Sequence, residues 1–172
     1  MKEIMNKILL TKTHFIFSDE AKLEIGCGNQ EHWRADYHIR LDKIDFGQDI
    51  VWDLLNGIPL PDNFCSHIYA SHTFEHLPQD KIVFVMNECW RVLRKGGELW
   101  VIVPHVEAVS AYIPSHLTRF NETSFKFFTG ETNPDYKNIS EGHGIDIKMW
   151  DTIELVKNER PDIHWRTVPR GK

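Results

Sequence analysis

The sequence has few of the residues that hold together small secreted domains or metal-stabilised domains. Only three cysteines occur in 172 residues, and none are spaced C-x-x-C as in a thiolate zinc site. A disulfide framework needs paired cysteines and is typical of smaller, secreted chains. We therefore expect Cys27, Cys65 and Cys89 to be reduced thiols, as in a cytoplasmic protein.

Long hydrophobic runs and an excess of basic charge are also missing. No stretch approaches the roughly 20 apolar residues of a membrane-spanning helix. The apolar run near the N-terminus is shorter than a signal peptide requires, and Lys7 interrupts it. A formal net charge of -5 argues against the basic face that binds phosphate backbones. We expect a protein that binds neither membranes nor nucleic acids, and the sequence leaves its oligomeric state open.

What is present is typical of one ordinary globular domain. Hydrophobic residues make up 41% of the chain and charged residues 26%, which is close to the average for globular proteins. A chain of 172 residues can bury one sizeable core but is too short for two comfortable ones. We predict a single domain over residues 1–172.

The most informative stretch is AKLEIGCGN, residues 21–29, in which a short strand-like run ends at Gly26 and Gly28. Glycine lets the backbone turn sharply and approach a ligand closely. In an open α/β sheet, the rest of that ligand's site lies at the carboxyl ends of neighbouring strands. A dinucleotide-binding turn would have a third glycine where Glu31 stands, and a carboxylate there would repel phosphate. The turn therefore favours a ligand without phosphate.

Further apolar runs predict a mainly parallel sheet. Strand-like runs occupy residues 22–25, 38–42, 49–54, 65–71 and 98–104. The clearest helix runs from Pro78 to Leu93, with one broad apolar stripe, and we expect Gly96 and Gly97 to end it. The nearly continuous apolar run ELWVIVP over 98–104 is typical of a strand covered on both faces. Alternation of strands and crossovers indicates parallel pairing.

The C-terminal part predicts one more helix and two strands. Asn121 is placed to cap a helix start, and Gly130 to close that helix. Residues 145–156 and 163–168 alternate well enough to form a hairpin-like pair at one edge, which would complete a seven-stranded sheet. At the other end of the chain, residues 4–9 have the spacing of a short amphipathic helix.

Two carboxylates follow consecutive predicted strands. Asp42 follows the glycine-bearing strand at close to the offset of about 20 residues at which a carboxylate meets a ribose diol. Asp53 lies near the end of the next strand-like run, over 49–54. Each alone fits an ordinary turn residue equally well, but their joint placement favours a binding site. Trp52 beside them can offer a π-face to a ligand or pack in the core.

A cluster of titratable residues, His72, Glu75 and His76, follows the run over 65–71, and its spacing places the three on one face of a helical turn. Three interpretations stay open. His72 can act as a general base; the trio can bind a divalent metal; or Glu75 caps a turn and His76 is packed with a hydrogen bond. A second polar group, able to meet an anionic acceptor, follows residue 104: His105, His116 and Arg119.

Five segments, EIGCG, LD, WDL, ASHTFEHLP and LRKGGELWVIVPH, occur in an order and spacing that resemble class I S-adenosylmethionine (SAM)-dependent methyltransferases. The likeness is greatest to a small branch with a short first crossover and a SHxLEHL-type signature, here with Phe74 at the Leu position. It covers about residues 22–105. It implies an α/β fold of three layers, Rossmann-like, with a seven-stranded mainly parallel sheet whose last strand is antiparallel.

The resemblance also implies SAM as the cofactor and a set of residues that bind it: Glu24, Gly26, Cys27, Gly28, Asp42, Asp53, Leu54 and Ser71. Glu24 and the glycine turn would surround the methionine portion, the acid holding its ammonium directly or through water. Asp42 would take the ribose hydroxyls. Asp53, with the backbone at Leu54, would bind the adenine edge.

On this basis we predict methyl transfer to a small-molecule or sugar-type acceptor, at oxygen or nitrogen, in the cytoplasm. Ser71 and His72 would line the floor near the methyl, and His72 and His76 are the candidate catalytic residues, with no resident metal. Two alternatives stay open. The chain is a module that binds SAM or S-adenosylhomocysteine (SAH) without activity, or it is a metal-dependent enzyme built on His72, Glu75 and His76.

The same reasoning divides the single domain into three parts. Residues 1–20 are an N-terminal extension, and residues 21–105 form the cofactor-binding core. Residues 106–172 supply a helix and the edge strands on the acceptor side.

Overall fold

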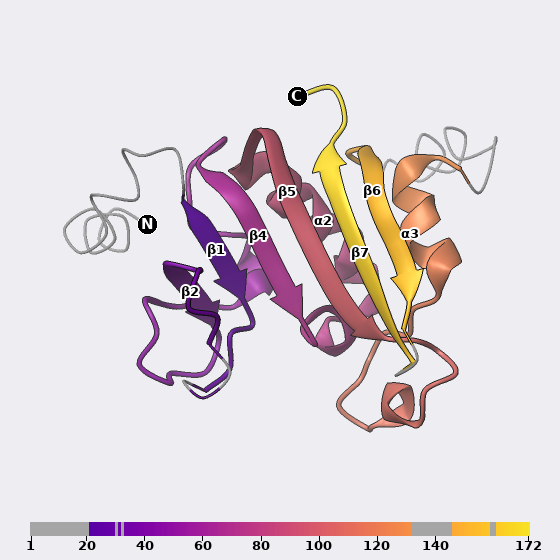
Figure 1. The fold of residues 1–172 in the computed structure, drawn as a ribbon. Helices are drawn as coiled ribbons and strands as arrows, with labels where there is room; N and C mark the ends of the chain where they lie inside the picture. Colours follow the sequence, from indigo (N-terminus) through magenta and orange to yellow (C-terminus); the bar gives the residue numbers. More distant parts are fainter. Residues whose placement is uncertain (1–20, 30, 32, 132–145, 159–160) are drawn as a thin grey trace.

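The computed structural model describes residues 21–29, 31, 33–131, 146–158 and 161–172, and the helix predicted over 4–9 lies outside them. The described residues form one seven-stranded sheet in the order β3-β2-β1-β4-β5-β7-β6 (Figure 1). The strands are β1 (Lys22–Ile25), β2 (Ile39–Asp42), β3 (Ile50–Val51), β4 (Cys65–Ser71), β5 (Leu93–Pro104), β6 (Trp150–Lys157) and β7 (Asp162–Pro169).

The strand directions agree with the predicted fold class. The pairs β1–β2, β2–β3, β1–β4 and β4–β5 are parallel. The last strand, β7, is antiparallel to both of its neighbours, β5 and β6. The α/β, Rossmann-like sheet with an antiparallel last strand is therefore confirmed.

The predicted helix over 78–93 begins as a 3-10 turn, η4 (Gln79–Lys81), and continues as α2 (Ile82–Val92). The expectation that Gly96 and Gly97 end it is wrong. Leu93 is already extended and pairs with Cys65, so the strand starts directly after the helix. The two glycines lie inside β5, where the register with β4 shifts and Gly96 has φ +72°. They accommodate an irregularity in the strand.

The second predicted helix, α3 (Glu122–Thr129), has the expected ends. Asn121 Oδ1 accepts a hydrogen bond of 3.1 Å from the Ser124 N–H, and Gly130 closes the helix in the left-handed conformation. The rings of Phe120 and Phe125 stack with centroids 5.5 Å apart, which fixes how the chain enters the helix.

One face of the sheet is buried under α2 and α3 (Figure 1). Alternate strand residues, among them Leu99 and Trp165, belong to the same core cluster as Met86 of α2 and Phe125 of α3. Leu99 is 0% exposed and Trp165 1% exposed. Both described α-helices therefore cover the same face.

The other face is polar and only partly buried. Glu98, Trp100 and Ile102 of β5 are all of intermediate exposure, so the expectation that this strand is covered on both faces is wrong. No α-helix among the described residues covers this face. Of the three layers expected, the described residues form the sheet and one layer of helices.

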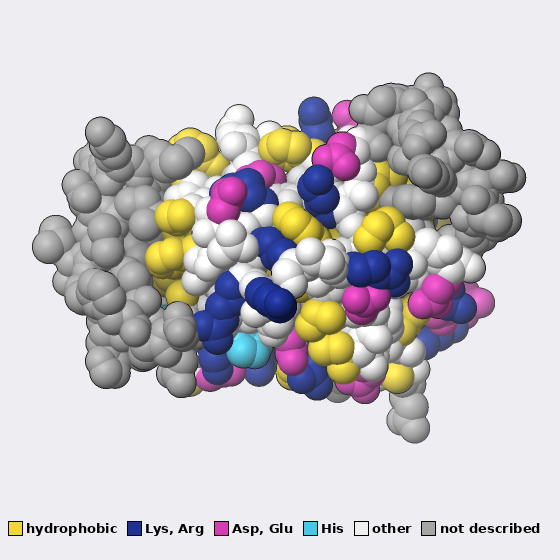
Figure 2. All heavy atoms as spheres, turned by 90° about the horizontal axis from the view of Figure 1, so that it is seen from above, with side chains coloured by type: hydrophobic (Ala, Val, Ile, Leu, Met, Phe, Trp, Pro, Cys, Tyr) yellow, Lys and Arg dark blue, Asp and Glu magenta, His cyan; other side chains and the backbone are white. Residues whose placement is uncertain are grey.

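The two ends of the parallel strands also differ. The edge at their amino ends carries intermingled basic and acidic side chains with small hydrophobic groups between them (Figure 2). A cavity lies at the carboxyl ends of the parallel strands instead. Among the described residues no helix is long and apolar enough to cross a membrane.

Candidate functional site

The glycine turn after β1 is fixed by backbone contacts. The N–H groups of Gly26 and Cys27 both point at the Leu41 carbonyl oxygen, at 2.8 and 3.3 Å. Gly26 has φ +64°, and a Cβ there would lie 2.2 Å from Thr73 Oγ1. Gly26 is thus required for the close approach of the loop after β4. The Thr73 hydroxyl in turn lies 3.1 Å from the Ile25 carbonyl oxygen, to which it can donate.

Gly28 is open where Gly26 is crowded. Its φ is +59°, and a Cβ there would meet nothing within 4 Å. Its N–H donates to Asp42 Oδ2 at 3.0 Å, while Asp42 Oδ1 accepts from the Ile44 N–H at 3.0 Å. One backbone donor therefore fixes each carboxylate oxygen, and each oxygen keeps a further lone pair for a ligand hydroxyl.

Asp53 and Trp52 follow β3 and have structural roles as well. Asp53 caps the 3-10 helix η2 (Leu54–Asn56), since its Oδ1 accepts from the Leu55 N–H at 2.9 Å. The Trp52 indole donates to the Gly57 carbonyl oxygen at 3.0 Å and packs against the core. Both residues also line the cavity, so their structural roles leave the predicted binding role open to test.

This cavity has a volume of about 620 Å³, within the range of roughly 300–1,000 Å³ typical of small-molecule sites. Most of the predicted site residues line it: Gly26, Gly28, Asp42, Asp53, Leu54, His72 and His76. The sequence reasoning missed other lining residues, which come from four segments: Leu41, Lys43, Ile44 and Phe46; Leu55; Thr73, Leu77 and Pro78; and Ser115 and Leu117. Residues 43–46 directly follow Asp42, a predicted site residue, and this position could have predicted that their loop lines the same cavity.

Three predicted residues, Glu24, Cys27 and Ser71, do not line this cavity. Glu24 is 4% exposed, accepts the Arg34 N–H at 3.2 Å and lies 3.8 Å from the Arg40 guanidinium. Burial raises the pKa of Glu24, against the lowering effect of these donors. Burial also raises the pKa of the Cys27 thiol to about 12, so it stays protonated at neutral pH.

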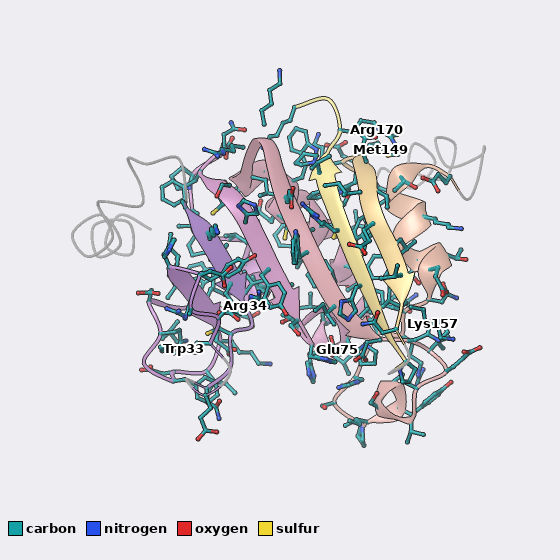
Figure 3. The ribbon with its side chains drawn as sticks, viewed as in Figure 1. Trp33, Arg34, Glu75, Met149, Lys157 and Arg170 are labelled. Atoms are coloured by element: carbon teal, nitrogen blue, oxygen red, sulfur yellow. The ribbon has the colours of Figure 1, made fainter. Side chains whose placement is uncertain are left out.

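The short crossover after the glycine turn is held by side chains. The Trp33 indole donates to the Gly28 carbonyl oxygen at 3.0 Å, and the Arg40 guanidinium lies 4.8 Å from the Trp33 ring centroid. The Arg34 guanidinium lies 4.5 Å from the Tyr69 ring centroid. Figure 3 shows Trp33 and Arg34 on this segment and Glu75 beyond the carboxyl end of β4, at the same edge of the sheet.

His72 occupies a turn directly after β4, with φ +50°, a backbone conformation that is strained for a residue with a side chain. Its Nδ1 lies 3.2 Å from Glu75 Oε1. This hydrogen bond raises the pKa of His72, while partial burial opposes the rise. The His72 side chain is exposed and lines the cavity, so its predicted catalytic role remains a prediction.

The residues that can share a metal ion differ from the predicted trio. Among the described residues, the ligand atoms of Glu75, His76 and His116 lie within 4.8 Å of one another, and His72 is not part of this group. His72 Nδ1 instead contacts Oε1 of Glu75, at 3.2 Å. The second predicted polar group does not converge: His105 Nε2 lies 3.3 Å from Glu122 Oε2, and the Arg119 guanidinium lies 4.6 Å from the Tyr112 ring centroid.

Comparison with known proteins agrees with this architecture. Residues 23–101 match the family described as "Methyltransferase domain". None of the curated protein sequences matches the chain. A SAM-dependent methyltransferase from Archaeoglobus fulgidus has a similar structure, with a TM-score of 0.57 and 14% identity over 97% of this chain and 94% of that chain.

Two further solved structures share the fold. N-methyltransferase NodS from Bradyrhizobium japonicum has a TM-score of 0.53 and 12% identity, with 97% of each chain covered. The 1,6-didemethyltoxoflavin-N1-methyltransferase of Burkholderia thailandensis, solved with 1,6-didemethyltoxoflavin and SAH, has a TM-score of 0.54 and 10% identity over 96% of this chain and 77% of that chain. The family match covers residues 23–101, and these solved structures show that the chain shares the fold of SAM-dependent methyltransferases.

Proposed function

We propose that the chain transfers the methyl group of SAM to the oxygen or nitrogen of a small-molecule or sugar-type acceptor. The observation that carries the proposal is the convergence of the glycine turn, Asp42 and Asp53 on one cavity at the carboxyl ends of β1, β2 and β3. The free, buried cysteines of the described residues support a cytoplasmic setting. SAM supplies the electrophilic methyl, so the protein's task is to position the acceptor and exclude water.

The residues present fit an adenosyl ligand. Asp42 offers a carboxylate already oriented by two backbone donors, which suits the vicinal hydroxyls of a ribose. The open space at Gly28 lets a ligand approach the backbone. The Asp53 carboxylate, together with the backbone at Leu54, is placed to accept from and donate to an adenine edge.

Glu24, Cys27 and Ser71 would support the methionine end less directly. Glu24 lies on β1 immediately before the turn, and Arg34 and Arg40 already occupy its carboxylate in part. An ammonium reached through a water molecule is the contact that this arrangement favours. Cys27 fills the turn as a buried, protonated thiol, and Ser71 ends β4 beside the cavity loop.

His72 is our candidate for the group that takes a proton from the acceptor. Donation from Nδ1 to the Glu75 carboxylate leaves Nε2 as the nitrogen with a free lone pair. His76 lies on the same cavity wall as the second catalytic candidate. Leu77, Pro78 and Leu117 border the same region and provide apolar surface that excludes water.

Calorimetry with SAM and SAH tests the cofactor site. Asp42→Ala removes a charged acceptor of hydrogen bonds, so we expect SAM binding to weaken by about 1–3 kcal/mol. Asp45→Ala is the matched control, because Asp45 caps the Gly47 N–H on the same loop and does not line the cavity. Unchanged affinity in Asp42→Ala would remove Asp42 from the site.

Turnover on a panel of hydroxyl and amine acceptors separates an enzyme from a module that only binds SAM or SAH. His72→Ala should leave SAM affinity within about twofold, because no cofactor contact is assigned to it, and should slow SAH production at least about tenfold, as the loss of a general base does. The release of SAH is the measured quantity. Equal rates in the wild type and His72→Ala would exclude His72 as the base.

A further inference from the structure

We propose that Glu75, His76 and His116 bind one divalent first-row transition-metal ion at the wall of the cavity. Glu75 lies beyond the carboxyl end of β4 (Figure 3), within the 3-10 turn η3 (Phe74–His76). His116 comes from the segment after η5 (Val109–Tyr112). The three ligand atoms lie within 4.8 Å of one another.

Two buried polar atoms of this group lack partners. Glu75 is 1% exposed, and its Oε2 has no hydrogen-bond partner among the described residues. His116 Nδ1 is likewise buried and without a partner in the described part of the chain. Leaving such atoms unpaired costs about 1–3 kcal/mol each, and more for a charged group. A metal ion between them would satisfy both.

The remaining contacts hold the ligands in the required states. A carbonyl oxygen only accepts, so the 3.1 Å contact between His76 Nδ1 and the Ser115 oxygen places the proton on Nδ1 and leaves the Nε2 lone pair free. His72 contacts Oε1 of Glu75, not the unpaired Oε2. Contacts of this kind, from a ligand's second atom to a neighbouring group, orient metal ligands in many proteins.

The backbone brings the two segments together independently of the side chains. The Glu75 carbonyl oxygen accepts from the Leu117 N–H at 2.7 Å and from the Thr118 N–H at 3.1 Å. The Thr118 hydroxyl donates to the Leu77 carbonyl oxygen at 2.7 Å. His116 is therefore held beside Glu75 and His76 before any ion binds, and the His76 and His116 rings meet edge to face with centroids 4.7 Å apart.

The donor set selects the class of ion. Two imidazole nitrogens and one carboxylate oxygen are typical of zinc sites that keep a fourth position open, and of other first-row ions. Calcium and magnesium prefer more oxygen ligands. Tetrahedral coordination at bond lengths of about 2.0–2.1 Å needs ligand atoms about 3.4 Å apart. The ligand atoms lie within 4.8 Å of one another, so a small shift of the exposed His76 side chain, with its Nδ1 contact kept, would close this distance.

The position of the site has a consequence that rests on the proposed function. His76, Ser115 and Leu117 line the cavity in which the acceptor would be bound. An ion with an open position there would coordinate an acceptor oxygen or nitrogen and lower its pKa. Metal binding itself requires neither SAM nor an acceptor.

The test is calorimetric titration of chelator-treated protein with Zn²⁺ alone, repeated with Co²⁺ while the visible absorption of the bound ion is recorded. We expect one ion per chain, and at least tenfold weaker binding in both Glu75→Gln and His116→Ala. His164→Ala is the matched control, since His164 lies on the polar face of the sheet, outside this group, and should bind Zn²⁺ like the wild type.

Absence of stoichiometric binding in the wild type overturns the proposal, and so does unchanged binding in both ligand variants. Circular dichroism checks that each variant folds; if Glu75→Gln does not, His116→Ala decides. SAH titration of the same samples separates the proposed metal site from the proposed methyltransferase function. Lost Zn²⁺ binding with retained SAH binding in His116→Ala supports the metal site, and Zn²⁺ binding without any SAH binding supports it while removing the proposed function.

Discussion

The two faces of the sheet are built from alternate residues of the same strands, yet they are stabilised in different ways. Toward α2 and α3, Leu99 and Trp165 are almost fully buried in an apolar cluster. Toward the other face, Glu98, Trp100 and Arg166 remain partly exposed. Parallel sheets usually bury both faces under their crossover helices. Here no α-helix among the described residues covers the second face, and the strand residues on it are polar or only partly buried instead.

Pairing replaces burial on the polar face. The Arg166 guanidinium donates to both carboxylate oxygens of Glu98, at 2.7 and 2.8 Å, and lies 5.1 Å from the Trp100 ring centroid. A similar contact between a guanidinium and an aromatic ring occurs at Tyr69 of β4, where the Arg34 guanidinium lies over the ring. Ion pairs at a partly solvated surface contribute little free energy, whereas buried apolar side chains contribute much. The difference between the faces should therefore appear directly in the stability of variants.

The largest effect is expected on the buried face. Trp165→Ala removes a side chain whose ring lies 4.9 Å from Phe125 and 6.2 Å from Trp150, centroid to centroid. It also leaves Thr152 Oγ1 without the indole donor, now at 3.0 Å. We expect the free energy of unfolding to fall by about 3–5 kcal/mol, as for other buried Trp→Ala changes. Denaturant titration followed by circular dichroism measures it.

Trp100→Ala is the matched control on the polar face. The residue type is the same and the strand is adjacent, but Trp100 is only partly buried and its neighbours are Arg166 and Glu98. Its loss should lower the free energy of unfolding by about 1 kcal/mol. Equal losses in the two variants would contradict the comparison, and would mean that the polar face is covered as closely as the other.

Local signals in the sequence were sufficient for most of the fold. The ends of α3 follow from Asn121 and Gly130, which act within one helical turn. The bounds of β4 follow from its apolar run, which ends at Ser71. In each case the deciding interaction lies within a few residues along the chain.

The features that sequence reasoning missed depend on distant residues. A Gly-Gly pair three residues after a helix resembles a helix end, and only the pairing of Leu93 with Cys65 places it inside β5. The need for glycine at position 26 comes from Thr73, on another loop. The placement of His116 beside Glu75 depends on hydrogen bonds between segments about 40 residues apart. No periodicity in the sequence encodes these contacts.

The smallest expected effect is the contribution of the Glu98–Arg166 pair on the polar face to the pH dependence of the free energy of unfolding. The hydrogen bonds from Arg166 lower the pKa of the Glu98 carboxyl. A group whose pKa is lowered on folding stabilises the protein above its unfolded pKa, about 4.3 for Glu, and this contribution is lost as the pH falls through the folded value. Because the pair is partly exposed, we expect the contribution to be below about 1 kcal/mol.

Glu98→Gln tests this contribution through the acid limb of the stability curve. The variant should lose that small increment at pH 7 and should show a correspondingly shallower fall in unfolding free energy below about pH 4.5, since one linked proton is removed. High salt should reduce the difference between wild type and variant, because it screens partly exposed charges. A loss at pH 7 as large as that of Trp165→Ala would show that the Glu98–Arg166 pair is desolvated, and that the two faces of the sheet are alike after all.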